Sequence, residues 1–276
     1  MVRPLYCLLA VSASIALGAE ARLGDIKIHY ESTGQGSTAV VLIHGWTCDH
    51  TFWRLNAPAL AKQHRVLGVD LPGHGMSSKP EIPYTMSLFA RAVEAVMRHA
   101  GVDRAVLVGH SMGVPVIRQF HREFPGKVTG LVMVDGGVPR ERGTDDAKRK
   151  ASERYTGSDF KEKAGQAIDS MFVEATTPGL REEIKRKMLA TPQHVLASAY
   201  TEIFEPSTRT PDGTGLPVLY IFARRTATPP DQEQFLRGLF PKLAYEPWEG
   251  AGHFLMMEQP DRFNRVLLAF LEKNHP

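Results

Sequence analysis

The chain has 276 residues, of which 43% are hydrophobic and 23% are charged, as is ordinary for a globular protein. This length suits one large α/β domain with an inserted segment. A net charge of +3, with no arginine stripe interleaved with aromatic residues, argues against a nucleic-acid partner.

The N-terminal segment has the pattern of a secretory signal peptide. Arg3 gives it a positive start, residues 5–17 are apolar, and small residues at 16–18 or 19–21 form a possible cleavage site. The apolar run is too short to remain as a membrane span. We expect residues 1–21 to be a signal peptide and the protein to be periplasmic or extracellular. An N-terminal extension without a targeting role is the alternative. Cleavage would leave Cys48 without a disulfide partner.

The first buried strand is expected over residues 39–43, and it runs into His44-Gly45-Trp46. Gly45 allows close approach of the backbone to a substrate, and this loop can offer the Trp46 N–H to an oxyanion. A second strand over residues 66–69 is followed by residues 70–77, where Pro and Gly indicate a tight turn.

A helix over residues 88–97 and a strand over 105–108 lead to Gly109-His110-Ser111-Met112-Gly113. A Gly-x-Ser-x-Gly between a strand and a helix is typical of a nucleophile elbow, in which the serine hydroxyl stands above the sheet. The Met112 N–H, at a helix N-terminus, can stabilise an anion beside Ser111. The alternative is a glycine-rich turn that happens to contain serine.

The next strand, over residues 131–134, ends in Asp135. Ligands bind where parallel strands end, so Asp135 arrives at the correct edge of the sheet. Residues 139–206 then change in composition, with dense charges and no evident strand. A solvated loop or amphipathic helix is expected over 140–154, and further short helices over 160–172, 179–189 and 192–204.

The last part returns to strand and helix alternation, with a strand beginning at 217, a helix over 232–239 and a strand over 243–247. His253 follows in a loop of small residues that can direct its imidazole at a distant serine, which needs a base. An exposed loop histidine is the alternative. The overall alternation predicts a mostly parallel sheet with helices on both faces.

These motifs, in this order, resemble the α/β-hydrolase-fold family, in particular its esterase, lactonase, perhydrolase and carbon–carbon-bond hydrolase branch. The resemblance extends from about residue 23 to the C-terminus and rests on residues 44–46, 70–77, 109–113 and 252–254. It implies a core made of residues 22–138 and 207–276, with 139–206 as a helical lid after the sixth strand. It makes these side chains candidates for substrate binding, with plain packing as the alternative for the lid residues: Met171, Phe172, Met188, Leu196, Tyr200 and Phe254.

The acid of the triad is where this chain departs from the family pattern. The position that usually holds Asp, four residues ahead of a Pro, is Thr226, in a loop that Arg224 and Arg225 make basic. Some members, the haloalkane dehalogenases among them, keep the acid at the strand end that Asp135 occupies here. We therefore expect Asp135 as the acid. Asp231 is the second candidate, although Asp at such a position often caps the following helix, and a triad without an acid stays open.

The expected function is a serine hydrolase that cleaves a small or medium carboxylic ester or lactone through an acyl-enzyme. Ser111 is the expected nucleophile, His253 the base, and Asp135 the residue that orients the base. The oxyanion hole is expected from the N–H groups of Trp46 and Met112. No cofactor is required and no metal-ligand pattern is evident. A carbon–carbon-bond hydrolase, a perhydrolase and a small-molecule-binding protein with little turnover remain alternatives.

Overall fold

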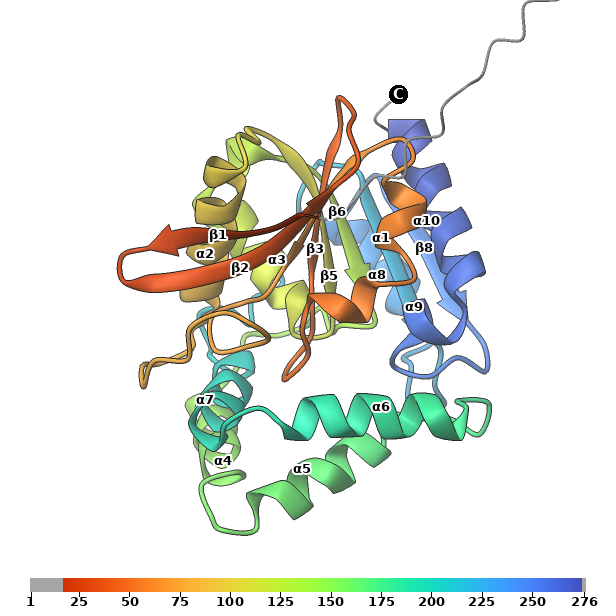
Figure 1. The fold of residues 1–276 in the computed structure, drawn as a ribbon. Coiled ribbons are helices and arrows are strands. Elements are labelled where there is room, and N and C mark those ends of the chain that lie inside the picture. The colour runs from red at the N-terminus through yellow and green to blue at the C-terminus, as the bar shows by residue number, and fades with distance from the viewer. Residues whose placement is uncertain (1–16, 275–276) are drawn as a thin grey trace, which may run out of the picture.

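A computed structural model describes residues 17–274 (Figure 1). Its centre is an eight-stranded sheet in the order β1-β2-β4-β3-β5-β6-β7-β8. The strands are β1 (Leu17–Leu23), β2 (Ile26–Thr33), β3 (Ala39–Ile43), β4 (Arg65–Val69), β5 (Ala105–His110), β6 (Val128–Val134), β7 (Val218–Ala223) and β8 (Leu243–Trp248). From β4 to β8 in this order, neighbouring strands pair in parallel. β2 pairs antiparallel with β4 on one side and with β1 on the other. The predicted fold class is confirmed.

Helices cover both faces of the sheet, which explains why its central strands are apolar throughout. In Figure 1, α2 (Met86–His99) and α3 (Gly113–Glu123) lie on one side and α10 (Pro260–Asn274) on the other. Every residue of β3 and β5 is buried, as is usual for parallel strands with helices on both faces. The smaller core helices are η1 (His50–Trp53), α1 (Ala57–Leu60), η2 (Pro125–Lys127), α8 (Gln232–Leu239) and α9 (Leu255–Glu258).

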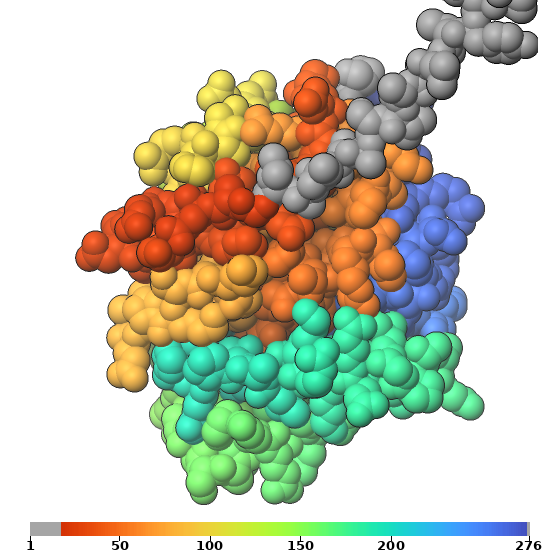
Figure 2. All heavy atoms as spheres, in the orientation of Figure 1, coloured from red at the N-terminus to blue at the C-terminus, as the bar shows by residue number. Residues whose placement is uncertain are grey.

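A helical layer separates β6 from β7 in the sequence and lies across one edge of the sheet (Figures 1 and 2). It consists of α4 (Asp145–Glu153), α5 (Phe160–Asp169), α6 (Pro178–Leu189) and α7 (Gln193–Ile203). These helices agree with the expected insertion after the sixth strand, including a helix within the charged stretch 140–154. We call residues 139–206 the lid.

The sheet begins inside the segment expected to be a signal peptide. β1 pairs with β2 from Leu17↔Ser32 to Leu23↔Ile26, and Ala21 is fully buried. Residues 1–16, which carry most of the predicted signal sequence, lie outside the described residues. Between residues 17 and 274, the helices are too short or too polar to cross a membrane.

Candidate active site

Ser111 lies on a strained turn between β5 and α3. Its φ of 53° is in the left-handed region, which a residue with a Cβ rarely adopts. The turn is held by a hydrogen bond from the Ser111 N–H to the Val134 carbonyl at 2.8 Å. A Cβ at Gly113 would lie 2.6 Å from the Ile43 carbonyl oxygen, so only glycine fits there. This is the geometry that the Gly-x-Ser-x-Gly pattern predicts, because the strained backbone presents the serine away from the sheet.

Asp135 and His253 come together across the ends of β6 and β8. The His253 Nδ1 atom lies 2.6 Å from Asp135 Oδ2, and the other carboxylate oxygen accepts the Ala223 N–H at 2.8 Å. Burial raises the pKa of the Asp135 carboxyl, but the hydrogen bonds and charges of His253 and Arg225 lower it by more. The pKa of Asp135 therefore lies well below its usual range, and the carboxylate stays ionised beside the imidazole.

Arg225 is a member of this cluster that the sequence analysis treated only as part of a basic loop. Its Nη2 atom lies 2.8 Å from Asp135 Oδ2, although 53% of its side chain is exposed. Only the tertiary structure identifies Arg225 as a partner of Asp135. Arg225 follows β7, and β7 is the neighbour of β6, whose end carries Asp135.

The other acid candidate, Asp231, forms no hydrogen bond or ion pair with His253 in the described part of the chain. Thr226, at the usual family position of the acid, is exposed. Asp231 is 58% exposed and forms an ion pair with Arg140 at 2.9 Å. No side-chain hydrogen bond from Asp231 caps α8, although this was the expected role. The structure thus brings Asp135, and not Asp231, to the histidine.

Two main-chain donors flank Ser111 without partners of their own. Within residues 17–274, neither the Trp46 N–H nor the Met112 N–H makes a hydrogen bond. The two loops are in close contact, because a Cβ at Gly45 would lie 3.1 Å from the Ser111 Cβ atom. Free N–H groups on both sides of a serine can stabilise a negatively charged oxygen.

The loop that carries Trp46 is anchored on both sides. The His44 Nδ1 atom lies 2.8 Å from the Gly45 carbonyl oxygen, and Nε2 accepts the Leu71 N–H at 3.1 Å. The Trp46 indole donates to the Leu196 carbonyl at 2.9 Å, so its ring ties the core to the lid. Cys48, two residues after Trp46 in this loop, is a buried free thiol.

His253 is held through its main chain as well as its ring. Its carbonyl oxygen lies 2.9 Å from Nε2 of the buried His110, and its N–H donates to the lid carbonyl of Met171 at 3.0 Å. Burial lowers the pKa of His110 to about 3, so this support is neutral. The Ser111 hydroxyl makes no hydrogen bond to His253 in this structure. Such a bond is often long until a substrate binds.

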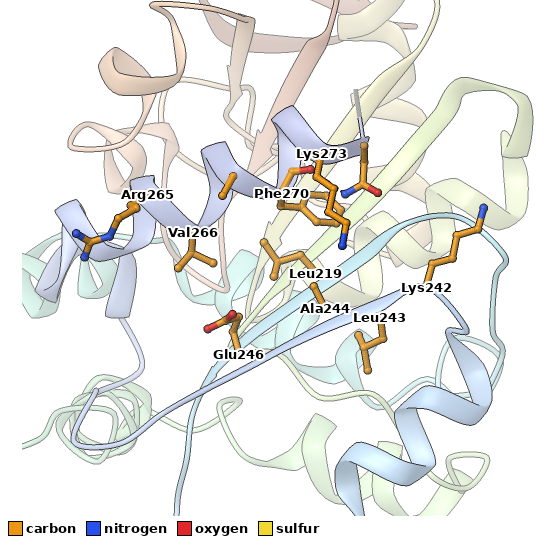
Figure 3. Close-up of a pocket in the computed structure, with 11 residues that line it drawn as sticks. Leu219, Lys242, Leu243, Ala244, Glu246, Arg265, Val266, Phe270 and Lys273 are labelled. Carbon is orange, nitrogen blue, oxygen red and sulfur yellow. Dashed lines mark hydrogen bonds between the residues drawn. The ribbon is translucent and has the colours of Figure 1, made fainter. Parts of the chain in front are cut away.

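A cavity of about 140 Å³ opens directly beside Ser111. It is lined by Ser111, Met112, Pro115, Arg118, Asp135, Gly136, Gly137, Pro139, Ile203, Thr208 and Arg209. A larger cavity of about 720 Å³ lies between α10 and the β7–β8 edge of the sheet (Figure 3). The larger cavity contains neither Ser111, Asp135 nor His253, so we take the cavity beside Ser111 as the candidate substrate site.

The side chains predicted to bind substrate do not line the cavity beside Ser111; they pack between lid and core. Met188, Leu196 and Phe254 are buried. Phe172 packs on Phe254 with ring centroids 6.0 Å apart, and Tyr200 packs on Trp46. Met171 reaches the site through its carbonyl. The lining residues Ile203, Thr208 and Arg209 come from the end of α7 and the segment after it, which the sequence pattern did not single out.

Comparison with known proteins identifies the family of the chain. The family model described as "Alpha/beta hydrolase family" matches residues 40–266. The chain belongs to the alpha/beta hydrolase family. This hydrolase is also similar to solved esterase structures. A thermophilic esterase from Thermogutta terrifontis is 25% identical, with a TM-score of 0.82 and coverage of 95% of this chain and 100% of that one. An esterase from Rhodococcus sp. is 27% identical, with a TM-score of 0.76 and coverage of 93% and 99%.

Curated relatives include enzymes with different names. The 2-hydroxy-6-oxononadienedioate/2-hydroxy-6-oxononatrienedioate hydrolase of Burkholderia vietnamiensis is 28% identical, over 90% of this chain and 92% of its own length. The dihydrolipoyllysine-residue acetyltransferase component of the acetoin cleaving system of Pseudomonas putida is 27% identical, over 91% of this chain and 68% of its own length. The match to the Cupriavidus necator protein of the same name spans only 30% of that protein. The family model, the esterase structures and the Burkholderia vietnamiensis enzyme support a hydrolase and leave its substrate open.

Proposed function

We propose that this alpha/beta hydrolase cleaves a carboxylic ester or lactone, with Ser111 as nucleophile. The observation that carries the proposal is the 2.6 Å contact between His253 Nδ1 and the buried Asp135 carboxylate, beside a serine on a strained elbow. A carboxylate at Nδ1 fixes the imidazole tautomer and leaves Nε2 free to accept a proton.

In the proposed first half-reaction, Ser111 Oγ attacks the substrate carbonyl carbon while His253 Nε2 takes the hydroxyl proton. Asp135 stabilises the imidazolium that forms, and Arg225 keeps Asp135 ionised. The carbonyl oxygen becomes negative and accepts hydrogen bonds from the Trp46 and Met112 N–H groups. When the tetrahedral intermediate collapses, the bond to the alcohol oxygen breaks and His253 returns the proton to that oxygen.

The second half-reaction uses the same groups with water as the nucleophile. His253 takes a proton from water, whose oxygen attacks the acyl carbon. Collapse breaks the bond to Ser111 Oγ, which regains its proton from the imidazolium, and the carboxylic acid leaves. The cavity of about 140 Å³ favours a short acyl or alcohol group, because drug-sized ligands occupy cavities of roughly 300–1,000 Å³.

A second candidate activity is hydrolysis of a carbon–carbon bond by the same residues. The similarity to the Burkholderia vietnamiensis hydrolase over most of both chains supports it. Perhydrolysis with peroxide and small-molecule binding without turnover are the remaining alternatives. In perhydrolysis, peroxide would react at the Ser111 site. In the binding alternative, no reaction would take place there.

The deciding experiment is turnover of 4-nitrophenyl acetate and of a small lactone by wild type, Ser111→Ala and Ser170→Ala. Ser170 is an exposed lid serine, so its replacement is the matched control. We expect hydrolysis by wild type and the control and none above background by Ser111→Ala. Equal rates in wild type and Ser111→Ala would contradict the proposal. Absence of turnover in wild type would favour the carbon–carbon or binding alternatives, which a diketone substrate separates.

We also propose that the N-terminal segment directs export. Its apolar run and small residues support this, and the burial of Ala21 in the sheet favours cleavage no later than Gly18. The mass of the protein recovered from the periplasm or medium of an expressing bacterium tests the position of cleavage. Cytoplasmic protein that retains Met1 would contradict export.

A further inference from the structure

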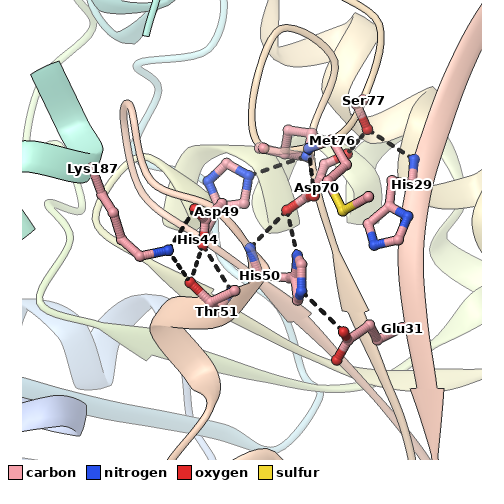
Figure 4. Close-up of polar contacts among 12 residues, drawn as sticks. His29, Glu31, His44, Asp49, His50, Thr51, Asp70, Met76, Ser77 and Lys187 are labelled. Carbon is pink, nitrogen blue, oxygen red and sulfur yellow. Dashed lines mark hydrogen bonds and ion pairs between the residues drawn. The ribbon is translucent and has the colours of Figure 1, made fainter. Parts of the chain in front are cut away.

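A second cluster of polar side chains lies on the core outside the Ser111 site (Figure 4). It contains His29 of β2, His50 at the start of η1, and Asp70, which follows β4. These positions are fixed by the main chain. The Asp70 N–H donates to the His29 carbonyl at 3.0 Å, and the His50 N–H donates to Asp70 Oδ1 at 2.7 Å. The strand pairing of β2 with β4 therefore builds the cluster.

Each of the three side chains offers one metal-ligating atom, and these atoms all lie within 4.8 Å of one another. His50 Nδ1 and Asp70 Oδ1 are 2.8 Å apart, which is hydrogen-bond distance. Among the described residues, His29 Nε2 is buried and makes no hydrogen bond. A buried ring nitrogen without a partner is costly, and a metal ion is one group that satisfies it.

A carboxylate stands on the far side of His50. Glu31 Oε1 lies 3.2 Å from His50 Nε2, and 43% of the Glu31 side chain is exposed (Figure 4). His29 and Glu31 are two residues apart on β2 and therefore lie on the same face of the strand. Metal-bound histidines commonly donate their second N–H to such a carboxylate, which fixes the tautomer and the ring orientation.

We propose that His29, His50 and Asp70 bind one divalent transition-metal ion, with Zn²⁺ as the best match. Two imidazole nitrogens and one carboxylate oxygen form a common ligand set for Zn²⁺, with water in the fourth position. The ion takes the place of the hydrogen on His50 Nδ1, and the ring keeps one proton on Nε2, which faces Glu31. A second proton, present when the ring is charged, leaves to solvent. Glu31 orients His50 from outside the ligand set.

The bound ion would connect β2, β4 and η1. η1 begins two residues after Cys48, in the loop that carries the Trp46 N–H, so the ion would also stabilise that loop. The sequence analysis found no metal-ligand pattern, and the proposed site departs from that expectation. The three ligands come from three elements, and only the sheet register brings them together.

The test is titration of Zn²⁺ into protein freed of metal by EDTA, by calorimetry at pH 7.5, for wild type, His29→Gln and His194→Gln. His29 is the informative position, because its Nε2 makes no hydrogen bond that folding needs. The control, His194, is a lid histidine whose Nε2 contacts only the Lys79 carbonyl. We expect one equivalent bound by wild type and the control, and affinity at least tenfold lower in His29→Gln.

Two further measurements keep the outcome independent of hydrolase activity. Co²⁺ should give visible absorption bands with wild type that are lost in His29→Gln, and Glu31→Gln should weaken Zn²⁺ binding by about 10- to 100-fold. Urea unfolding in EDTA checks that the variants fold as wild type does. Wild type that binds no Zn²⁺, or a folded His29→Gln that binds it as tightly as wild type, would overturn the proposal.

Discussion

Two buried aspartates in this fold each hold a histidine through Nδ1, and their surroundings differ. Asp135 follows β6 and contacts His253 at 2.6 Å, while Asp70 follows β4 and contacts His50 at 2.8 Å. Each carboxylate also accepts a main-chain N–H, from Ala223 and from His50 respectively. Burial raises the pKa of Asp70, but its histidine partner and main-chain donors lower it to about 2, the same direction as for Asp135.

The difference lies at the second nitrogen of each histidine. His50 Nε2 faces the carboxylate of Glu31, so the ring is enclosed by acceptors. His253 Nε2 makes no hydrogen bond within the described part of the chain, and the loop of His253 lies over the turn that carries Ser111. A histidine–aspartate pair is therefore not by itself an active site. A nucleophile, free N–H donors and a cavity must stand at the free nitrogen.

Asp135→Asn should have the largest effect on catalysis of the variants considered. The amide cannot hold the imidazole tautomer that leaves Nε2 as acceptor, so we expect kcat for ester hydrolysis to fall about 10⁴-fold. The measurement is steady-state turnover with the best aryl ester. Asp70→Asn is the matched comparison, and its folded fraction should lose far less of the kcat of wild type. A loss of kcat shared equally by both variants would contradict the separate roles.

Asp70→Asn should instead reduce stability. Removal of one partner from a buried pair costs about 3–5 kcal/mol of unfolding free energy near neutral pH. Because folding lowers the pKa of Asp70 from 3.8 to about 2, its charge stabilises the fold above pH 3.8, and this stabilisation is lost as the pH falls through about 2. Urea unfolding of wild type and variant from pH 7 down to pH 2 should show the two curves converge. A constant difference over that range would exclude the carboxylate charge as the cause.

Arg225→Gln should produce a smaller effect at the catalytic pair. The half-exposed guanidinium is screened by solvent, and exposed ion pairs contribute about 0.2–1 kcal/mol, so we expect kcat/KM to fall up to about fivefold. The measurement is steady-state turnover with the same ester. Arg225→Lys keeps the charge and should restore the kcat/KM of wild type. An unchanged kcat/KM in Arg225→Gln would mean that Arg225 only packs beside the site.

Asp231→Asn should have the smallest effect. Asp231 is exposed and paired with Arg140, so kcat and the urea midpoint should match those of wild type. The same assay as for Asp135→Asn provides the measurement. If kcat fell as far as in Asp135→Asn, Asp231 would have to reach His253 in solution, and the assignment of the acid would be wrong.

Local patterns predicted the elements of this chain closely. The apolar runs at 39–43 and 243–247 match β3 and β8 to within a residue, and the helix over 232–239 has the bounds of α8. The helix over 88–97 was predicted too short, since α2 extends two residues beyond it at each end. The lid helices were found, but Pro139 and Ile203, the lid residues that line the cavity beside Ser111, were not. Which residue of a lid helix meets a cavity depends on how the helix packs, and sequence periodicity does not fix that.

The sequence by itself determined the fold class and the strained turn at Ser111, because both depend on neighbours within a few residues. Glycines two positions before and after the serine and an apolar strand ahead of it are enough to predict the turn. Only the tertiary structure decided which carboxylate meets His253, that Arg225 shares it, and that His29 and His50 lie beside Asp70. Those contacts join residues 20 to 118 positions apart. The order and register of the strands create them, and no local pattern in the chain records that order.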